Sequence, residues 1–135
     1  MSEFIWPVRI YYEDTDSGGV VYHSNYLNFM ERARTEWLRS MQLEQDDIIN
    51  EHAIMFVVRS LTIDYLKPAV FNDKLIVKSS FQKVGKASVV FEQLILRQSS
   101  DEILTKAIVK IASLDVIQKK PAVIPQAVYN KFLSV

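Results

Sequence analysis

The sequence predicts an α+β domain in which an antiparallel sheet of about five strands covers one long helix. Apolar residues recur at three- and four-residue intervals between residues 25 and 41, which is the spacing of a helix with one apolar side. Five other segments, one before this helix and four after it, are rich in β-branched and aromatic residues, as strands are. Long strands with one apolar face need a covering element, and the helix is the candidate.

The first predicted strand spans Phe4–Glu13. After Pro7 its side chains partly alternate, so that Val8, Ile10 and Tyr12 fall on one face of a sheet. We expect this strand to end where the acidic residues begin.

A turn and the long helix follow. Gly18 and Gly19 allow backbone conformations that are closed to other residues, and Ser24 or Asn25 has the polar side chain of a helix cap. The helix is predicted to run from Asn25 to about Met41, with its charged residues on the solvated side. Its apolar side, predicted to lie in the core, consists of Tyr26, Phe29, Met30, Ala33, Trp37 and Met41.

Four more strands are predicted after a short acidic segment, residues 44–51, that forms a helical turn or two. The breaks between the strands contain Lys-Pro-Ala, Val-Gly-Lys and Ser-Ser-Asp-Glu, which are typical of turns. The last three strands are predicted to form an antiparallel meander. The tail, residues 125–135, has a weak helical pattern that we expect to pack against the edge of the sheet. The four predicted strands are Ala53–Tyr65, Lys74–Lys83, Ala87–Arg97 and Ile103–Ile117.

Length and composition indicate a single globular domain, residues 1–135. Basic and acidic residues balance at 16 each, so no global field attracts nucleic acid or an anionic membrane. Cysteine is absent, which excludes thiolate catalysis and fits a reducing compartment. The first residues lack a signal-peptide pattern, and the longest apolar run, Ala53–Val58, is far shorter than the roughly 20 residues of a membrane helix. We therefore expect a cytoplasmic protein without membrane insertion.

Residues 12–34 indicate a chemistry, because acidic residues, a glycine turn and a histidine come just before the start of the long helix. Backbone N–H groups and the helix dipole favour an ionised carboxylate there, so Asp16 is available as a nucleophile or a general base. The N–H groups around Tyr22, His23 and Ser24 can polarise a carbonyl oxygen.

Two other interpretations of these residues stay open at this point. The acidic and glycine residues can simply form a turn that leads into the helix. Asp14, Asp16 and His23 can also be interpreted as the ligands of a metal hydrolase, but carboxylates that alternate on one extended segment converge poorly on a metal ion.

The segment combines specific residue types at fixed offsets: Tyr12, Asp14, Thr15, Asp16, Gly19, Val20, Val21, Tyr22, His23, Asn25, Tyr26, Phe29, Glu31, Ala33 and Arg34. This pattern resembles the signature of the 4-hydroxybenzoyl-CoA thioesterase branch of the hotdog fold and, within it, the Tol-Pal-associated acyl-CoA thioesterases. Ser17 and Ser24 stand where small residues such as alanine are expected, and both are small.

The resemblance implies a strongly curved sheet around the helix and an acyl-CoA thioesterase that releases a free carboxylic acid and the CoA thiol. The second acid of the motif, Asp16, then acts on the thioester, and His23 assists. Attack by Asp16 to give a mixed anhydride and activation of a water both stay open, with water favoured for short aliphatic acyl groups. Substrate contacts are expected at Tyr22, Ser24 and Asn25.

Other expectations concern partners. Arg59, Lys67, Lys83 and Lys86 are candidates for binding the CoA phosphates. Asp14 is expected to accept backbone N–H bonds in the turn. No cofactor or metal is expected, and the resemblance implies a homodimer or homotetramer. The acyl chain length and the carrier, CoA or acyl carrier protein, stay open, as do two alternatives: a hotdog dehydratase and a non-catalytic module that binds acyl-CoA or acyl carrier protein.

Overall fold

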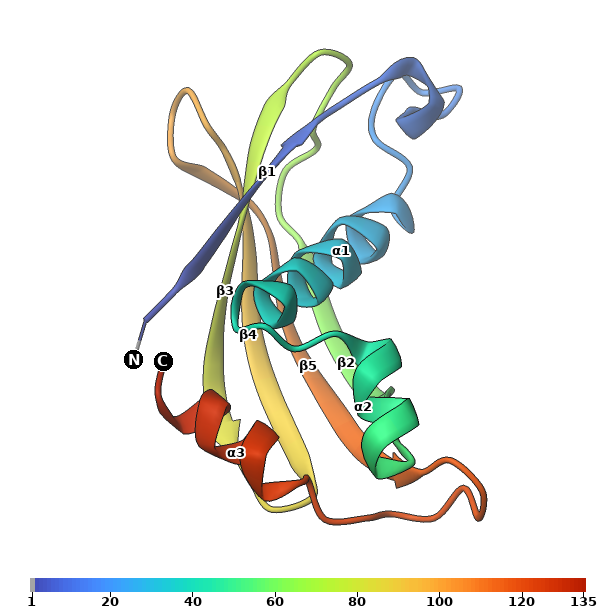
Figure 1. Cartoon of the computed structure of the whole chain (residues 1–135). Coiled ribbons are helices and arrows are strands. Elements are labelled where there is room, and N and C mark those ends of the chain that lie inside the picture. The colour runs from blue at the N-terminus through green and yellow to red at the C-terminus, as the bar shows by residue number, and fades with distance from the viewer. Residues whose placement is uncertain (1) are drawn as a thin grey trace.

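The computed structural model describes residues 2–135 and contains a five-stranded antiparallel sheet that curves around one long helix, α1 (Figure 1). The strand order is β1-β3-β4-β5-β2, and each neighbouring pair is antiparallel. This confirms the predicted fold class. The elements are β1 (Phe4–Arg9), the 3₁₀ helix η1 (Tyr12–Asp14), α1 (Asn25–Ser40), α2 (Gln45–His52), β2 (Ile54–Tyr65), β3 (Lys74–Val84), β4 (Ser88–Arg97), β5 (Glu102–Asp115) and α3 (Gln126–Leu133).

The meander predicted for the last three strands is confirmed, since β3 pairs with β4 and β4 with β5. Three interruptions of the register, including one in β2 between Val58 and Ser60, bend the sheet. The sheet therefore wraps around α1 instead of lying flat against it (Figure 1).

The core lies between α1 and the concave face of the sheet. The helix buries the apolar side that the periodicity predicts, apart from Met41, which follows the helix and is only partly buried. Trp37 is central, because its ring stacks on Phe81 at 4.3 Å and lies 5.9 Å from the ring of Phe91 and 6.0 Å from that of Phe4. These contacts join the helix to three strands of the sheet.

The first strand is shorter than predicted. It ends at Arg9, not Glu13, and residues 12–14 form η1. The reason is local, because the amide of Tyr11 donates to the carboxylate of Asp14 at 2.8 Å instead of to a neighbouring strand. Tyr12, expected on the same face of the strand as Ile10, is therefore exposed, whereas Ile10 is buried.

Two further expectations were wrong. Ser24 precedes α1 but makes no capping hydrogen bond, because its backbone is already helical (φ −72°, ψ −18°) and a cap needs an extended residue. The tail helix α3 does not lie at the edge of the sheet. The ring of Phe132 lies 5.3 Å from Phe81 of β3 and 6.2 Å from Phe56 of β2, so α3 covers the concave face.

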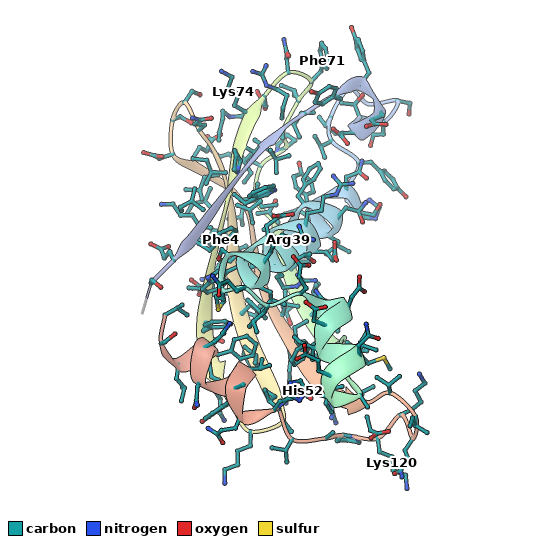
Figure 2. All side chains as sticks on the ribbon, in the orientation of Figure 1. Phe4, Arg39, His52, Phe71, Lys74 and Lys120 are labelled. Atoms are coloured by element: carbon teal, nitrogen blue, oxygen red, sulfur yellow. The ribbon has the colours of Figure 1, made fainter. Side chains whose placement is uncertain are left out.

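The outer strands of the sheet are β1 and β2. β1 carries Pro7, which has no N–H to donate, whereas β2 is twelve residues long and presents one whole unpaired edge. Within residues 2–135, no helix has both the length and the apolar character required to cross a membrane. Figure 2 shows Phe71 and Lys74 at the end of the molecule near η1 and His52 at the other.

Candidate functional site

The loop that carries Asp16 is a tight reversal of the chain. Thr15 and Val21 pair as an antiparallel bridge, and the amide of Asp16 donates to the carbonyl of Val20 at 2.9 Å. Gly19 donates back to the carbonyl of Asp16 at 3.0 Å and has a φ of +81°, a left-handed conformation that favours glycine. The loop therefore has a defined shape, as the glycine turn predicts.

The Asp16 side chain is exposed at the tip of this loop. Its Oδ1 accepts the backbone N–H of Gly18 at 2.8 Å, and Oδ2 has no hydrogen-bond partner among the residues described. A Cβ atom at position 18 would lie 3.1 Å from Oδ1, so glycine leaves this oxygen room. The carboxylate is thus oriented through one oxygen, with the other available for chemistry.

Asp14 connects the loop to the start of α1. Its carboxylate accepts the amide of Tyr11, as the sequence predicts for a structural role. Its backbone carbonyl accepts both the amide of Tyr22 at 2.9 Å and the side-chain amide of Asn25 at 2.8 Å. The N–H of Tyr22, expected to help polarise a carbonyl, is therefore occupied, whereas the Asn25 side-chain amide uses one of its two N–H groups.

The amides that remain free lie at the helix start. In the part of the chain that the structure describes, the N–H groups of His23, Ser24 and Tyr26 have no hydrogen-bond acceptor. Because Ser24 is already helical, these donors belong to the unsatisfied first turn, where the positive end of the helix dipole lies. A carbonyl oxygen or an anion can occupy this position.

His23 is exposed beside a hollow of about 210 Å³ between residues 21–26 and 65–68. Its ring lies 4.6 Å from the ring of Tyr22 and 6.1 Å from that of Tyr65, whose hydroxyl donates to the His23 carbonyl at 3.1 Å. His23 thus lies beside this hollow at the helix start, and it makes no direct hydrogen bond to Asp16.

Tyr26 forms the floor of this hollow. Its hydroxyl accepts the backbone N–H of Ala69 at 3.0 Å, which fastens the β2–β3 connection to α1. Burial raises the pKa of the Tyr26 phenol, and burial also raises the pKa of Tyr65. Both phenols are therefore neutral hydrogen-bonding groups at physiological pH.

The basic candidates divide into two groups. Lys67 lines the hollow and donates to Glu102 at 2.8 Å, a bond that lowers the pKa of the Glu102 carboxyl. Arg59 is exposed at the bulge of β2, six residues and about 20 Å along the strand from Tyr65. Lys83 lies near the end of β3 and Lys86 in the turn between β3 and β4, so of these four candidates a single chain brings only Lys67 to His23.

Sequence reasoning missed three contacts around the site. The hydroxyls of Tyr65 and Tyr26 bond to partners 42 and 43 residues away, and Arg97 donates to the carbonyl of Pro68 at 3.1 Å, 29 residues away, while pairing with Asp73. No local sequence pattern indicates contacts between residues so far apart in the chain. Residues 2–135 contain no group of three histidine, aspartate or glutamate side chains placed to hold a metal, so Asp14, Asp16 and His23 do not form one.

Comparison with known proteins agrees with this geometry. Residues 18–104 match the family model of the thioesterase superfamily. The chain is 45% identical over 129 residues to the acyl-CoA thioesterase YbgC of Haemophilus influenzae, covering 96% of this chain and 93% of that protein. A probable thioesterase from Bartonella henselae shares 32% identity with a TM-score of 0.85, covering 92% and 100% of the two chains.

A 1,4-dihydroxy-2-naphthoyl-CoA thioesterase from Synechocystis is similar in fold, with a TM-score of 0.92 at 24% identity and coverage of 99% and 98%. Together with the long helix inside a curved sheet, these matches confirm both the hotdog fold and the reaction class that the motif indicates. The chain belongs to the thioesterase superfamily and is a thioester hydrolase.

Proposed function

We propose that this hydrolase cleaves acyl-CoA thioesters to a carboxylic acid and CoA, with Asp16 as the nucleophile or general base. The observation that carries the proposal is that an oriented carboxylate, Asp16, and the unoccupied backbone N–H groups at the start of α1 lie within one short segment, residues 16–26. Thioester hydrolysis requires both, a group that attacks or activates water and donors that stabilise the oxyanion. The relatives named as acyl-CoA thioesterases support the choice of substrate.

In the proposed reaction, the thioester carbonyl accepts hydrogen bonds from the free amides of His23 and Ser24. One such donor is typically worth about a hundred- to a thousandfold in rate. The free oxygen of Asp16 then attacks the carbonyl carbon directly, or it removes a proton from a water that attacks. Direct attack forms a mixed anhydride and expels the CoA thiolate, which takes up a proton, and water then hydrolyses the anhydride.

The other predicted residues take supporting roles. We assign the His23 ring to orienting the substrate and assisting proton transfer, since it borders the hollow next to the helix start. Lys67 in the same hollow is the basic residue of this chain placed to meet the CoA arm. Ser24 contributes its backbone N–H group, and Tyr22 and Asn25 hold the helix start to the loop through their bonds to the Asp14 carbonyl.

Rates of free-thiol release from acyl-CoA thioesters of increasing chain length test the function. We expect saturable hydrolysis with a preferred acyl length, measured beside hydration of an enoyl-CoA and hydrolysis of the same acyl group on acyl carrier protein. Thioester cleavage without hydration contradicts the dehydratase alternative. A chain that binds acyl-CoA but releases no thiol is a binding module, and that outcome refutes the proposal. An association with the Tol-Pal system stays a prediction.

We propose further that two chains pair through the open edge of β2, as a dimer that can associate again into a tetramer. An unpaired strand of twelve residues with Val58 exposed is an aggregation hazard, and pairing with a second copy removes it. Pairing also places Arg59 of one chain at the boundary with the other, where it can reach CoA phosphates. Sedimentation at micromolar concentration should show at least a dimer, and a monomer would contradict this assembly.

The proposed reaction uses water and the chain's own side chains, so it needs no cofactor. We place the protein in the cytoplasm, because a chain without cysteine forms no disulfides and fits a reducing compartment.

A further inference from the structure

The two peptide groups just before the start of α1 are held by different parts of the chain. The carbonyl of Tyr22 accepts the backbone N–H of Asn25 at 2.9 Å, so the turn that opens the helix holds this peptide. The next carbonyl, that of His23, accepts no backbone N–H from residues 2–135. It accepts the hydroxyl of Tyr65 instead, at 3.1 Å and from 42 residues further along the chain. The second peptide is therefore held by a side chain from another element.

This second peptide carries one of the two N–H groups that the proposed reaction uses. The carbonyl of His23 and the N–H of Ser24 belong to the same trans peptide plane, in which the two groups point in opposite directions. A hydrogen bond that fixes the direction of the carbonyl therefore fixes the direction of the N–H as well. Within the described chain the Ser24 N–H has no acceptor of its own, so its orientation depends on the bond at the carbonyl.

The Tyr65 ring is itself fixed by the sheet. Tyr65 is the last residue of β2 and pairs with Thr105 of β5. Its ring lies 5.7 Å from the ring of Tyr26 and 6.1 Å from the ring of His23, to which it is nearly perpendicular. The hydroxyl therefore extends from a paired strand to the helix start and joins the two.

We propose that Tyr65 is a positioning residue of this hydrolase: by holding the His23 carbonyl, its hydroxyl orients the Ser24 N–H toward the thioester oxygen. The inference rests on the proposed function, since the N–H group serves that reaction. A donor that is aligned before the reaction stabilises the oxyanion best, because no reorganisation is needed while the charge develops.

Tyr65→Phe tests this role, because it removes the hydroxyl and keeps the ring. We expect kcat for acyl-CoA hydrolysis to fall about tenfold, less than the roughly hundred- to thousandfold loss of a whole donor, since the Ser24 N–H remains but is no longer held. KM should stay within about twofold, because the hydroxyl is occupied by the protein and not by the substrate. Tyr65 is 44% exposed, so the variant does not disturb the core.

The carbonyl stretch of the bound thioester gives a second readout, which a change in stability alone does not move. It is measured by isotope-edited infrared difference spectroscopy in Asp16→Asn, where cleavage is expected to be slow enough to observe the bound substrate. Hydrogen bonds to the carbonyl oxygen lower its stretching frequency. Adding Tyr65→Phe to Asp16→Asn should therefore shift the band to higher frequency.

The matched control is Tyr129→Phe, which removes the same hydroxyl from α3, an element that does not line the hollow beside His23. It should leave both kcat and the carbonyl band of the Asp16→Asn complex unchanged. Melting temperatures of the variants, measured in parallel, show that each is folded.

Three results would overturn the inference and leave the proposed function standing. They are a kcat of Tyr65→Phe within about twofold of the wild type, a carbonyl band that does not move, and a raised KM at unchanged kcat, which would mean that the hydroxyl binds the substrate itself. Failure of the proposed function has a different result: the wild type releases no thiol, or Asp16→Asn turns over at the wild-type rate.

Discussion

Asp16→Asn is expected to reduce kcat for acyl-CoA hydrolysis by about a thousandfold or more. Asparagine keeps the size of the side chain and an oxygen that accepts the Gly18 amide, so the loop should keep its shape. It lacks the anionic oxygen that either route requires, whether that oxygen attacks carbon or removes a proton from water. Release of free CoA thiol under saturating substrate measures the effect.

The matched control is Glu13→Gln, which removes an exposed carboxylate from the neighbouring η1 helix. It should leave kcat within about twofold, since a surface change away from the reacting groups has little effect. Binding of a non-hydrolysable acyl-CoA analogue and the melting temperature should be similar in both variants. Turnover of Asp16→Asn at the wild-type rate would show that the carboxylate takes no part in the mechanism.

Trp37→Ala is expected to lower the free energy of unfolding by about 3–5 kcal/mol. The Trp37 ring is 4% exposed and stacks between the sheet and the helix, with Phe81 and Phe91 as neighbours. Alanine removes this contact area and leaves a cavity that the rigid sheet cannot fill completely. Urea denaturation followed by circular dichroism gives the difference in free energy.

Ile117→Ala is the control for that loss, because it also removes a large apolar side chain but from a residue that is 83% exposed. Its cost should stay below about 0.5 kcal/mol. Comparable losses in the two variants would mean that the aromatic cluster around Trp37 does not hold the helix in the sheet.

Features encoded by neighbouring residues could be predicted from the sequence. The helix follows from its apolar spacing, and the meander follows from strand composition interrupted by turn residues such as Gly85. The Asp16 loop and the free helix start are similarly local, since all their residues lie between positions 14 and 26. The catalytic roles of Asp16 and His23 stay predictions.

Features that depend on distant partners could not be predicted. The strand period of residues 4–13 continues to Tyr12, but the Asp14 carboxylate takes the Tyr11 amide and ends the strand early. The hydrogen bond from the Ala69 N–H to the Tyr26 hydroxyl joins positions 43 residues apart. The helical spacing predicts that Arg34 lies on the solvated side of the helix, but the curved sheet buries it.

The backbone carbonyl of Asp14 accepts two hydrogen bonds, and this affects how the enzyme can diversify. Because Tyr22 and Asn25 both donate to that one oxygen, the reactive loop and the helix start form a single unit held by main-chain and short polar groups. The side chains that shape the interior, such as Phe56 and Phe132, come from other elements. Substitutions in those walls can therefore reshape the interior while the Asp16 loop and the helix start keep their alignment.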